Sequence, residues 1–140
     1  MRYMVIVKAS EDSEAGRLPT TDQLSEMSAF NEELVKAGVM LAGEGLQPSS
    51  TGVRIRYDKN GRTTVVDGPF TETKELVAGF WILQVSSREE AIEWARKAPF
   101  RSGEVEVRKV SEAEDFGEAF TPELQAKEDQ MRAASAARQG

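Results

Sequence analysis

The feature of this chain that most constrains its fold is a strand–helix–strand pattern that occurs twice. In the first half, residues 2–8 and residues 39–42 are apolar runs, which predicts two buried strands. Between them we expect a loop over residues 9–19. Thr20 then opens a capping box with Gln23, and apolar residues follow at spacings of three and four. The sequence therefore predicts an amphipathic helix between the two strands.

An Asn-Gly pair in the middle of the chain indicates a hairpin. Residues 53–57 alternate between apolar and basic side chains, and residues 63–66 form a short β-branched run. Asn60-Gly61 lies between these runs, and Asn-Gly in such a position is the strongest short-range hairpin signal. We therefore expect two antiparallel strands joined by a tight turn.

The second half repeats the strand–helix–strand pattern. Residues 76–85 form a long run that is apolar on both faces. Ser87 and Glu90 are spaced as a second capping box, and the helix that follows must stop before Pro99. Valines at alternating positions then predict a last strand over residues 105–110.

This order predicts an α+β fold, the ferredoxin-like split βαβ arrangement with an inserted β-hairpin. Helices on one face of a small sheet leave its other face open. Because residues 76–85 are apolar on both faces, we expect a homodimer in which two such sheets pair. Trp81 and Trp94 are expected in the core or at that interface.

Composition and charge change after residue 110. Residues 1–110 hold 17 acidic and 15 basic side chains, a net charge of −2, whereas residues 111–140 hold 7 and 3, a net charge of −4. A helix is expected from Thr121-Pro122, and residues 135–140 are expected to be disordered. The sequence thus predicts a ferredoxin-like domain over 1–110 and an acidic C-terminal extension with one helix over 111–140.

The absence of cysteine and histidine excludes several kinds of chemistry. It leaves no disulfide, no thiol nucleophile, no Cys/His zinc site and no His-assisted serine mechanism. Acid–base chemistry would have to use carboxylates, Lys, Tyr or a cofactor, and no particular cofactor is predicted. The net charge of −6, without a basic stripe, is a poor match for nucleic acid. No apolar run is long enough for a membrane span or a signal peptide, so we expect a cytoplasmic protein.

The candidate site lies at two strand ends that carry glycines. Glu44 stands between two glycines, and Asp67 begins an Asp-Gly-Pro-Phe turn. If these ends face each other, the two carboxylates could share a proton, act in acid–base catalysis or hold an Mg²⁺-type ion. No metal ligands are assigned beyond that. The residues expected to contact a ligand beside them are Tyr3, Phe70, Glu72 and Lys74.

Each of these features also has a purely structural interpretation. Glu44 could cap a glycine-flanked bulge, and Asp67 could serve turn chemistry alone. Lys74 could form a surface ion pair with Glu72 or Glu75. The arginines of the 53–57 strand could lie on a solvated face or receive an anionic ligand.

Two segments together resemble a known family. GEGLQPS at residues 43–49 and DGPFTETKE at residues 67–75, followed by Gly79-Phe80, resemble the DGPF, or DGPFAETKE, family of the YCII-related superfamily. The resemblance covers residues 1–110 and continues into residues 114–124, and Thr71 in place of Ala is the one departure within the signature.

The resemblance implies a dimeric α+β barrel of ferredoxin-like subunits, each with a small cleft near an aspartate. YCII relatives with a proposed catalytic site use a His–Asp pair, which this chain cannot form without histidine. Some members resemble proteins encoded beside extracytoplasmic-function sigma factors.

Three functional hypotheses remain open from the sequence, and whether the protein is an enzyme is one of the open points. The first is a small-molecule binding or catalytic cleft around Asp67 and Glu44. The second is a non-catalytic accessory or regulatory protein that acts through its acidic C-terminal helix, with a link to sigma-factor regulation. The third takes the DGPF segment as a dimer brace, with Phe70 buried against the other subunit.

Overall fold

The computed structural model describes residues 1–139 and divides the chain into two compact units, Met1–Lys109 and Val110–Gly140. The first unit holds the sheet, the hairpin and three helices. The second holds a 3₁₀ segment and one long helix. No helix among residues 1–139 is long and apolar enough to cross a membrane.

A four-stranded antiparallel sheet in the order β2-β5-β1-β6 forms the centre of the first unit. Its strands are β1 (Arg2–Lys8), β2 (Met40–Gly45), β5 (Val77–Gln84) and β6 (Val105–Lys109). Each strand–helix–strand unit encloses a strand of the other, because β5 lies between β1 and β2, and β1 lies between β5 and β6. The predicted ferredoxin-like split βαβ arrangement is therefore confirmed.

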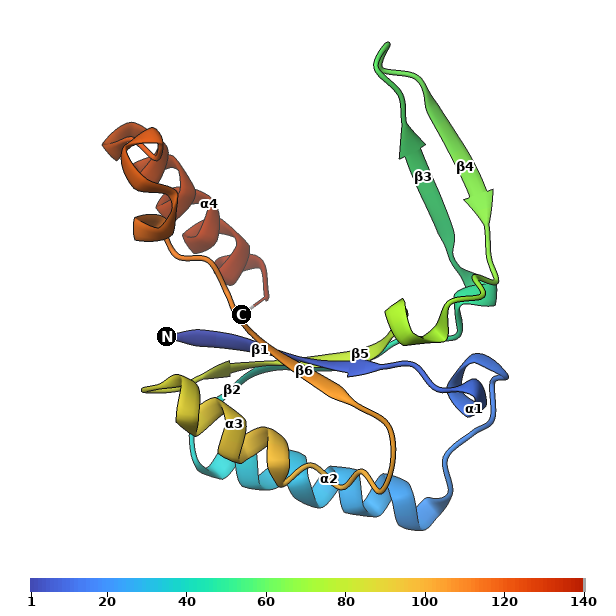
Figure 1. The fold of residues 1–140 in the computed structure, drawn as a ribbon. Coiled ribbons are helices and arrows are strands. Elements are labelled where there is room, and N and C mark those ends of the chain that lie inside the picture. The colour runs from blue at the N-terminus through green and yellow to red at the C-terminus, as the bar shows by residue number, and fades with distance from the viewer. Residues whose placement is uncertain (140) are drawn as a thin grey trace. The chain divides into compact units, whose positions relative to one another are not determined.

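Two long helices, α2 (Thr21–Lys36) and α3 (Arg88–Arg96), cover one face of this sheet (Figure 1). The predicted capping box of α2 is present, with Thr20 and Gln23 each accepting from the other's backbone N–H, at 3.2 and 3.0 Å. The second box is only half formed. Ser87 accepts from the N–H of Glu90 at 3.1 Å, but the Glu90 carboxylate turns to the N–H and hydroxyl of Ser86, both at 2.7 Å.

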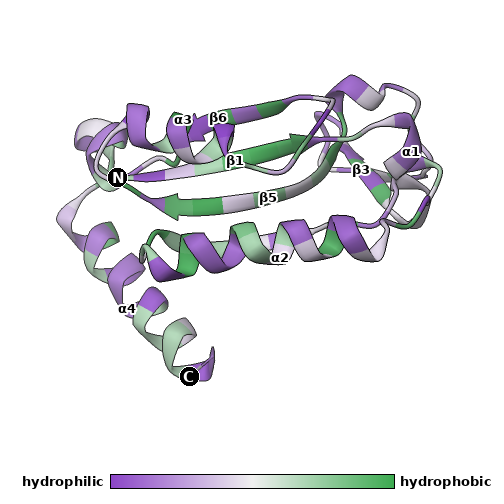
Figure 2. Ribbon diagram, turned by 90° about the horizontal axis from the view of Figure 1, so that it is seen from below, coloured by the Kyte–Doolittle hydropathy of each residue, from purple (hydrophilic) through white to green (hydrophobic). Residues whose placement is uncertain are grey.

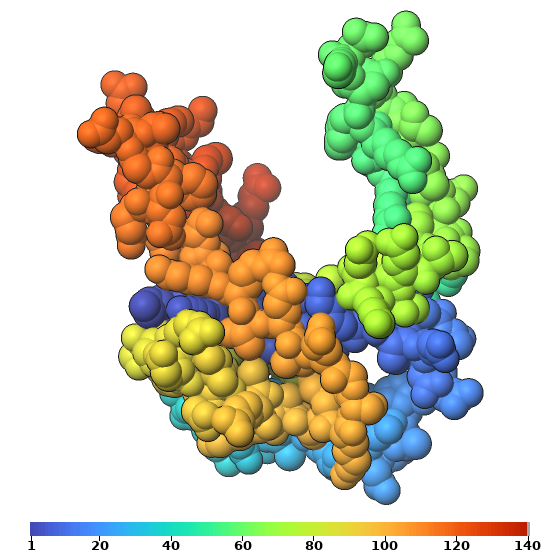
Figure 3. All heavy atoms as spheres, in the orientation of Figure 1, coloured from blue at the N-terminus to red at the C-terminus, as the bar shows by residue number. Residues whose placement is uncertain are grey.

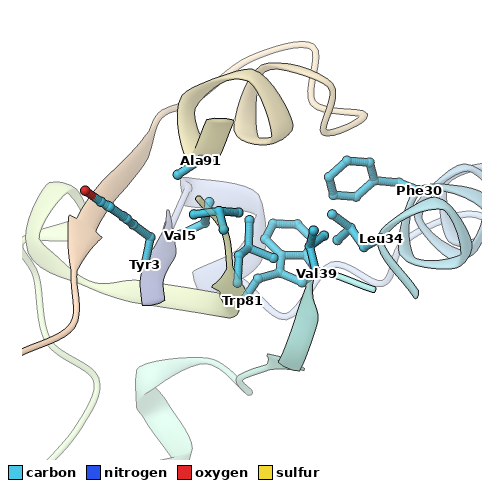
Figure 4. Close-up of a cluster of buried hydrophobic side chains, with 9 residues drawn as sticks. Tyr3, Val5, Phe30, Leu34, Val39, Trp81 and Ala91 are labelled. Atoms are coloured by element: carbon cyan, nitrogen blue, oxygen red, sulfur yellow. The ribbon is translucent and has the colours of Figure 1, made fainter. Parts of the chain in front are cut away.

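The hydrophobic core lies between the sheet and these helices (Figure 4), and hydrophobic residues recur along β1, β5 and α2 (Figure 2). Trp81 is its central aromatic residue, with Phe30 edge-on at 5.4 Å between ring centroids. Trp94 packs against the cluster from α3, so the prediction of core positions for both tryptophans is confirmed. The buried members are Tyr3, Val5, Phe30, Leu34, Val39, Trp81, Leu83, Val85 and Ala91.

The inserted hairpin consists of β3 (Val53–Tyr57) and β4 (Thr63–Asp67), which pair only with each other. It projects from the rest of the first unit (Figure 3). Its turn is closed by the Asp58 carboxylate, which accepts from the N–H groups of Asn60 and Arg62 at 2.8 and 2.9 Å. Gly61 supplies the positive φ that this turn needs, at 76°. The hairpin predicted from Asn-Gly is confirmed.

The structure differs from the sequence prediction in three local elements. A short helix, α1 (Glu11–Glu14), stands in the segment expected to be a loop, because Ser10 and Ser13 cap each other. Two 3₁₀ segments, η1 (Ser49–Thr51) and η2 (Thr73–Glu75), flank the hairpin. Hydrogen bonding alone distinguishes such single turns from loops, so the apolar pattern does not reveal them.

The second unit contains η3 (Ala113–Ala119) and α4 (Pro122–Gln139). Thr121 caps α4, since its hydroxyl accepts from the N–H of Leu124 at 3.3 Å, as the Thr-Pro signal predicted. The expected disorder at residues 135–140 is wrong for residues 135–139, which continue the helix because that stretch is rich in alanine. Gly140 lies outside the described residues.

We predict opposite tolerance for two glycines that pair across β2 and β5. A Cβ on Gly79 would lie 2.9 Å from the carbonyl oxygen of Glu44, whereas a Cβ on Gly45 meets nothing within 4 Å. Gly79→Ala should lower the free energy of unfolding by about 1–3 kcal/mol, because the strands must separate. Gly45→Ala should change it by less than about 0.5 kcal/mol. Urea denaturation measures both, and equal effects would contradict this account of the strand contact.

Candidate functional site

A cavity of about 290 Å³ lies between α2 and strands β2 and β5. Three glycines line it, Gly43, Gly45 and Gly79, and of these only Gly45 leaves open space where a Cβ would be. The residues that line it are Val7, Met27, Asn31, Gly43, Glu44, Gly45, Ala78, Gly79, Phe80, Trp81 and Phe100.

The walls of this cavity are aromatic and apolar, and one amide is fixed inside it. The rings of Trp81 and Phe100 lie 6.2 Å apart between centroids. The side-chain oxygen of Asn31 accepts from the indole N–H of Trp81 at 2.9 Å. That bond orients the amide and leaves its NH₂ group as a hydrogen-bond donor for a bound molecule. The site thus combines apolar walls with one oriented donor, as ligand pockets do.

A second cavity of about 490 Å³ adjoins the first and shares four lining residues with it, Val7, Met27, Ala78 and Phe100. Its remaining lining combines apolar residues with hydroxyl, amide and charged residues. They are Lys8, Ser10, Ser13, Pro19, Gln23, Leu24, Pro99, Arg101, Ser102, Gly103 and Glu104. A molecule held against Trp81 therefore has further space beside it, with some polar groups on its walls.

The two carboxylates of the predicted site have different surroundings. Glu44 lines the first cavity from the edge strand β2, with an exposed side chain. Glu44 pairs with Phe80, and paired residues project to the same face of a sheet. The Glu44 side chain therefore projects from the face opposite to the one that carries the Trp81 side chain. Asp67 ends β4 opposite Val53 and is exposed. Neither of the two adjoining cavities is lined by Asp67.

The other predicted ligand contacts are also dispersed. Tyr3 belongs to the buried core, and its ring carries the hydroxyl away from the cluster (Figure 4). Phe70 and Glu72 lie in the loop after the hairpin. Lys74 is exposed and forms no ion pair within residues 1–139, so the alternative of a salt bridge to Glu72 or Glu75 is wrong. Its ammonium group remains in water.

Ser49 joins the Asp-Gly-Pro-Phe segment to the body of the domain. The Glu14 carboxylate accepts from the N–H of Ser49 at 3.0 Å and also from its hydroxyl. The N–H of Phe70 donates to that same hydroxyl at 3.0 Å. One serine therefore connects α1, η1 and the loop that follows β4, and we call these contacts the Ser49 junction.

Two further contacts define the loop at the Ser49 junction. The N–H of Gly68 donates to the carbonyl of Gly52 at 3.0 Å, and a Cβ on Gly68 would overlap the Ser49 carbonyl oxygen. Only glycine fits so close to backbone. The guanidinium of Arg54 lies over the Phe70 ring, 3.8 Å from its centroid, which is a cation–π contact. Gly68 and Phe70 thus have steric roles in holding the hairpin base.

Charged side chains near the Ser49 junction and on the sheet shift the pKa values of two carboxyl groups. A hydrogen bond to Glu72 and the like charge of that residue raise the pKa of Glu75 above 4.5, against the opposing effect of Arg54 and Lys8. On the sheet, hydrogen bonds from Arg108 and Lys8 hold the pKa of Glu106 below 4.5. No group of three carboxylates among residues 1–139 is placed to hold a metal ion.

Sequence reasoning missed Met27, Asn31 and Phe100 as cavity residues. A signal for Asn31 was present, because it lies four residues after Met27 and so on the same stripe of α2. A polar residue within an apolar helical stripe indicates a buried partner or a ligand. Phe100 carries no such signal, since it follows Pro99 in a segment without periodicity.

Fold and cavity together define a small ferredoxin-like α+β domain with a cleft between its sheet and its first long helix. Residues 1–114 match the YCII-related domain, and the chain belongs to that family. A relative in Rhizobium meliloti (strain 1021), the uncharacterised protein R00369, is 34% identical over 91 residues, which cover 63% of this chain and 73% of the relative.

A solved structure is similar to this chain at low sequence identity. It is the 5-chloro-2-hydroxyhydroquinone dehydrochlorinase TftG from Burkholderia phenoliruptrix AC1100, in complex with 2,5-dihydroxybenzoquinone. The TM-score is 0.41 and the identity 16%, over 79% of this chain and 94% of that chain.

We predict that Ser49→Ala destabilises the hairpin base, whereas Ser50→Ala does not. The first change removes the hydroxyl that joins Glu14 to Phe70 and leaves both without that partner. The expected loss is about 1–3 kcal/mol in the free energy of unfolding. Urea denaturation gives the total, and hydrogen exchange at the Phe70 and Gly68 amides locates it. Equal stability of the two variants would show that the Ser49 junction does not hold the loop.

The lowered pKa of Glu106 predicts a stability difference that depends on pH. A carboxyl whose pKa is depressed by folding stabilises the protein above its unfolded pKa, and this contribution is lost as pH falls through the folded pKa. Arg108→Gln should therefore raise the Glu106 pKa toward 4.5, and its stability deficit should shrink below that pH. Carboxyl-carbon NMR titration measures the pKa, with Arg88→Gln as the control. An unchanged Glu106 pKa in Arg108→Gln would contradict the assignment.

Proposed function

We propose that this protein binds a small organic molecule in the cavity between α2 and strands β2 and β5. The observation that supports the proposal most directly is the oriented amide of Asn31 beside Trp81 within a glycine-walled space of about 290 Å³. That volume is near the lower end of the usual range for ligand pockets, and the adjoining 490 Å³ extends it.

The lining indicates the chemical class of the ligand. Trp81 and Phe100 favour a flat, largely apolar ring, because aromatic faces pack well on such surfaces. The Asn31 NH₂ group favours an oxygen acceptor on that ring. The polar walls of the second cavity suit a substituent that keeps contact with water. A ring of moderate size with a hydroxyl, carbonyl or carboxylate group meets these conditions.

A catalytic form of the proposal keeps Glu44 as the proton-transfer group. It requires a ligand that reaches around the edge strand β2, because the Glu44 side chain lies on the sheet face opposite to Trp81. Participation of Asp67 would require a ligand that extends from β2 to the hairpin, or a contribution from another subunit. The roles of Asp67, Tyr3, Phe70, Glu72 and Lys74 in binding stay predictions. So does the regulatory role of residues 111–140, for which the described residues favour no particular partner.

We also propose that the chain belongs to the DGPF branch of its family, on the signature at residues 67–75. We further propose a homodimer formed through the sheet face that α2 and α3 leave uncovered. Support comes from the apolar residues that the register places on that face, which are half-buried within a single chain. They are Met4, Ile6, Phe80 and Ile82.

Filling the cavity tests the binding proposal. Gly45→Leu places a side chain where a Cβ meets nothing within 4 Å. We expect it to weaken binding of 2-naphthol and 2-naphthoate, used as ring probes, by at least about tenfold, because the space is taken. Ligand-observed NMR and Trp81 fluorescence in a Trp94→Phe background measure the affinities. Gln47→Leu, which adds an apolar side chain outside the cavity, should bind as the unmodified chain does.

A second variant tests the polar contact. Asn31→Asp keeps an oxygen for the Trp81 N–H but removes the NH₂ donor and adds a negative charge. It should weaken 2-naphthoate more than 2-naphthol, by about tenfold in relative affinity. Undiminished binding of both probes to Gly45→Leu would place their site elsewhere. Glu44→Gln and Asp67→Asn in the same assay show which carboxylate contacts the probe.

A further inference from the structure

We propose that the β3–β4 hairpin, residues 53–67, is an arm that packs its apolar face onto a second copy of this chain. The proposal rests on the homodimer inferred above and goes beyond it, because it assigns a second contact surface outside the four-stranded sheet. We call residues 53–67 the arm.

The arm stands clear of the body of its own domain. Its strands pair with each other and with no strand of the main sheet. It rises from the end of the sheet on the side opposite α2 and α3 (Figures 1 and 3). The Ser49 junction fixes its base through Phe70, and Arg54 packs on that ring. The arm is therefore held in one direction while most of its length contacts nothing in residues 1–109.

One face of the arm is apolar and uncovered. Cross-strand pairs project to the same side, so Val53, Ile55, Tyr57 and Val65 share a face, with Thr63 near the turn and Asp67 at the base. The arginines at 54 and 56 share the other face with Thr64 and Val66. The exposed fractions of the four apolar residues are 54%, 50%, 77% and 63%. An isolated two-stranded hairpin is marginally stable in water, so an apolar face on it implies a partner surface.

The charge of the arm identifies the partner as a second copy. Residues 53–67 contain four basic and two acidic side chains, a net charge of +2. The whole chain carries −6, so the residues outside the arm carry −8. A basic arm is attracted to an otherwise acidic copy of the same chain, which guides the two together. A closed two-fold dimer uses both arms in this way.

The arm is also long enough. Two five-residue strands and their turn extend roughly 20 Å, whereas packed sheets lie about 10 Å apart. An arm rising on the uncovered side of one sheet would therefore pass the sheet of a second copy that lies on that face.

Charge-matched substitutions test the apolar face. Ile55→Glu and Val65→Glu place a carboxylate on it, and Thr64→Glu places the same charge on the opposite face. We expect the first two to raise the dimer dissociation constant at least about tenfold, because burial of one such side chain accounts for that much. Thr64→Glu should stay within about threefold. Sedimentation velocity measures all three, and circular dichroism checks that each variant is folded.

Cross-linking identifies what the arm touches. Because the chain has no cysteine, Tyr57→Cys and Thr64→Cys can each carry a single benzophenone group, on opposite faces of the arm. Mixed ¹⁴N and ¹⁵N copies are irradiated and the linked peptides are read by mass spectrometry. We expect mixed-isotope links from Tyr57→Cys to residues 1–109 of the other copy, several-fold more than from Thr64→Cys.

The outcomes separate the arm from the rest of the proposal. If Ile55→Glu leaves the dimer unchanged and no mixed-isotope links form, the proposal for the arm is overturned. The sheet-face dimer is then unaffected. A chain that stays monomeric at 100 µM overturns both. Neither result bears on the cavity, which the naphthyl probes test separately through Gly45.

Discussion

The fit of the Trp81 indole against glycine-bearing strand β2 is the contact on which most of the first unit depends. A Cβ on Gly43 would lie 2.8 Å from the indole ring, so the ring occupies space that any other residue would take. Phe30 closes the edge of the ring, and Asn31 accepts its N–H. This single side chain thus ties α2 to the sheet and forms one wall of the cavity. Core and candidate binding site therefore share this side chain.

The hairpin depends on a different set of interactions. Nothing in the main sheet pairs with β3 or β4, so the direction of the hairpin is decided at its base. There Ser49 donates to Glu14 and accepts from Phe70, and Gly68 fits against the Ser49 carbonyl. A buried or half-buried hydroxyl with both a donor and an acceptor role holds two backbone segments in one geometry. That explains how a two-stranded element with little contact of its own can still be oriented.

The strands, the long helices and the hairpin turn could be predicted from the sequence because each depends on local chemistry. Residues 2–8 and 77–84 are apolar runs, Thr20 is an N-cap, and Asn60-Gly61 is a hairpin turn. The candidate site could not be predicted equally well. Met27, Asn31 and Phe100 come together only through packing of α2 and the 99–104 segment on the sheet. A glycine is compatible both with close packing and with an open cavity, so the sequence alone does not reveal the space at Gly45.

The Asp-Gly-Pro-Phe signature and the cavity therefore arise from different physical constraints. Gly68 is required because another residue would overlap Ser49, and the Phe70 side chain offers a ring to Arg54. These demands account for the glycine and the aromatic residue of the Asp-Gly-Pro-Phe turn without a ligand. Asp67 is not explained in this way, since its exposed carboxylate makes no side-chain hydrogen bond or ion pair within residues 1–139. A carboxylate that makes no contact of this kind within its own chain is available to bind a group on another molecule.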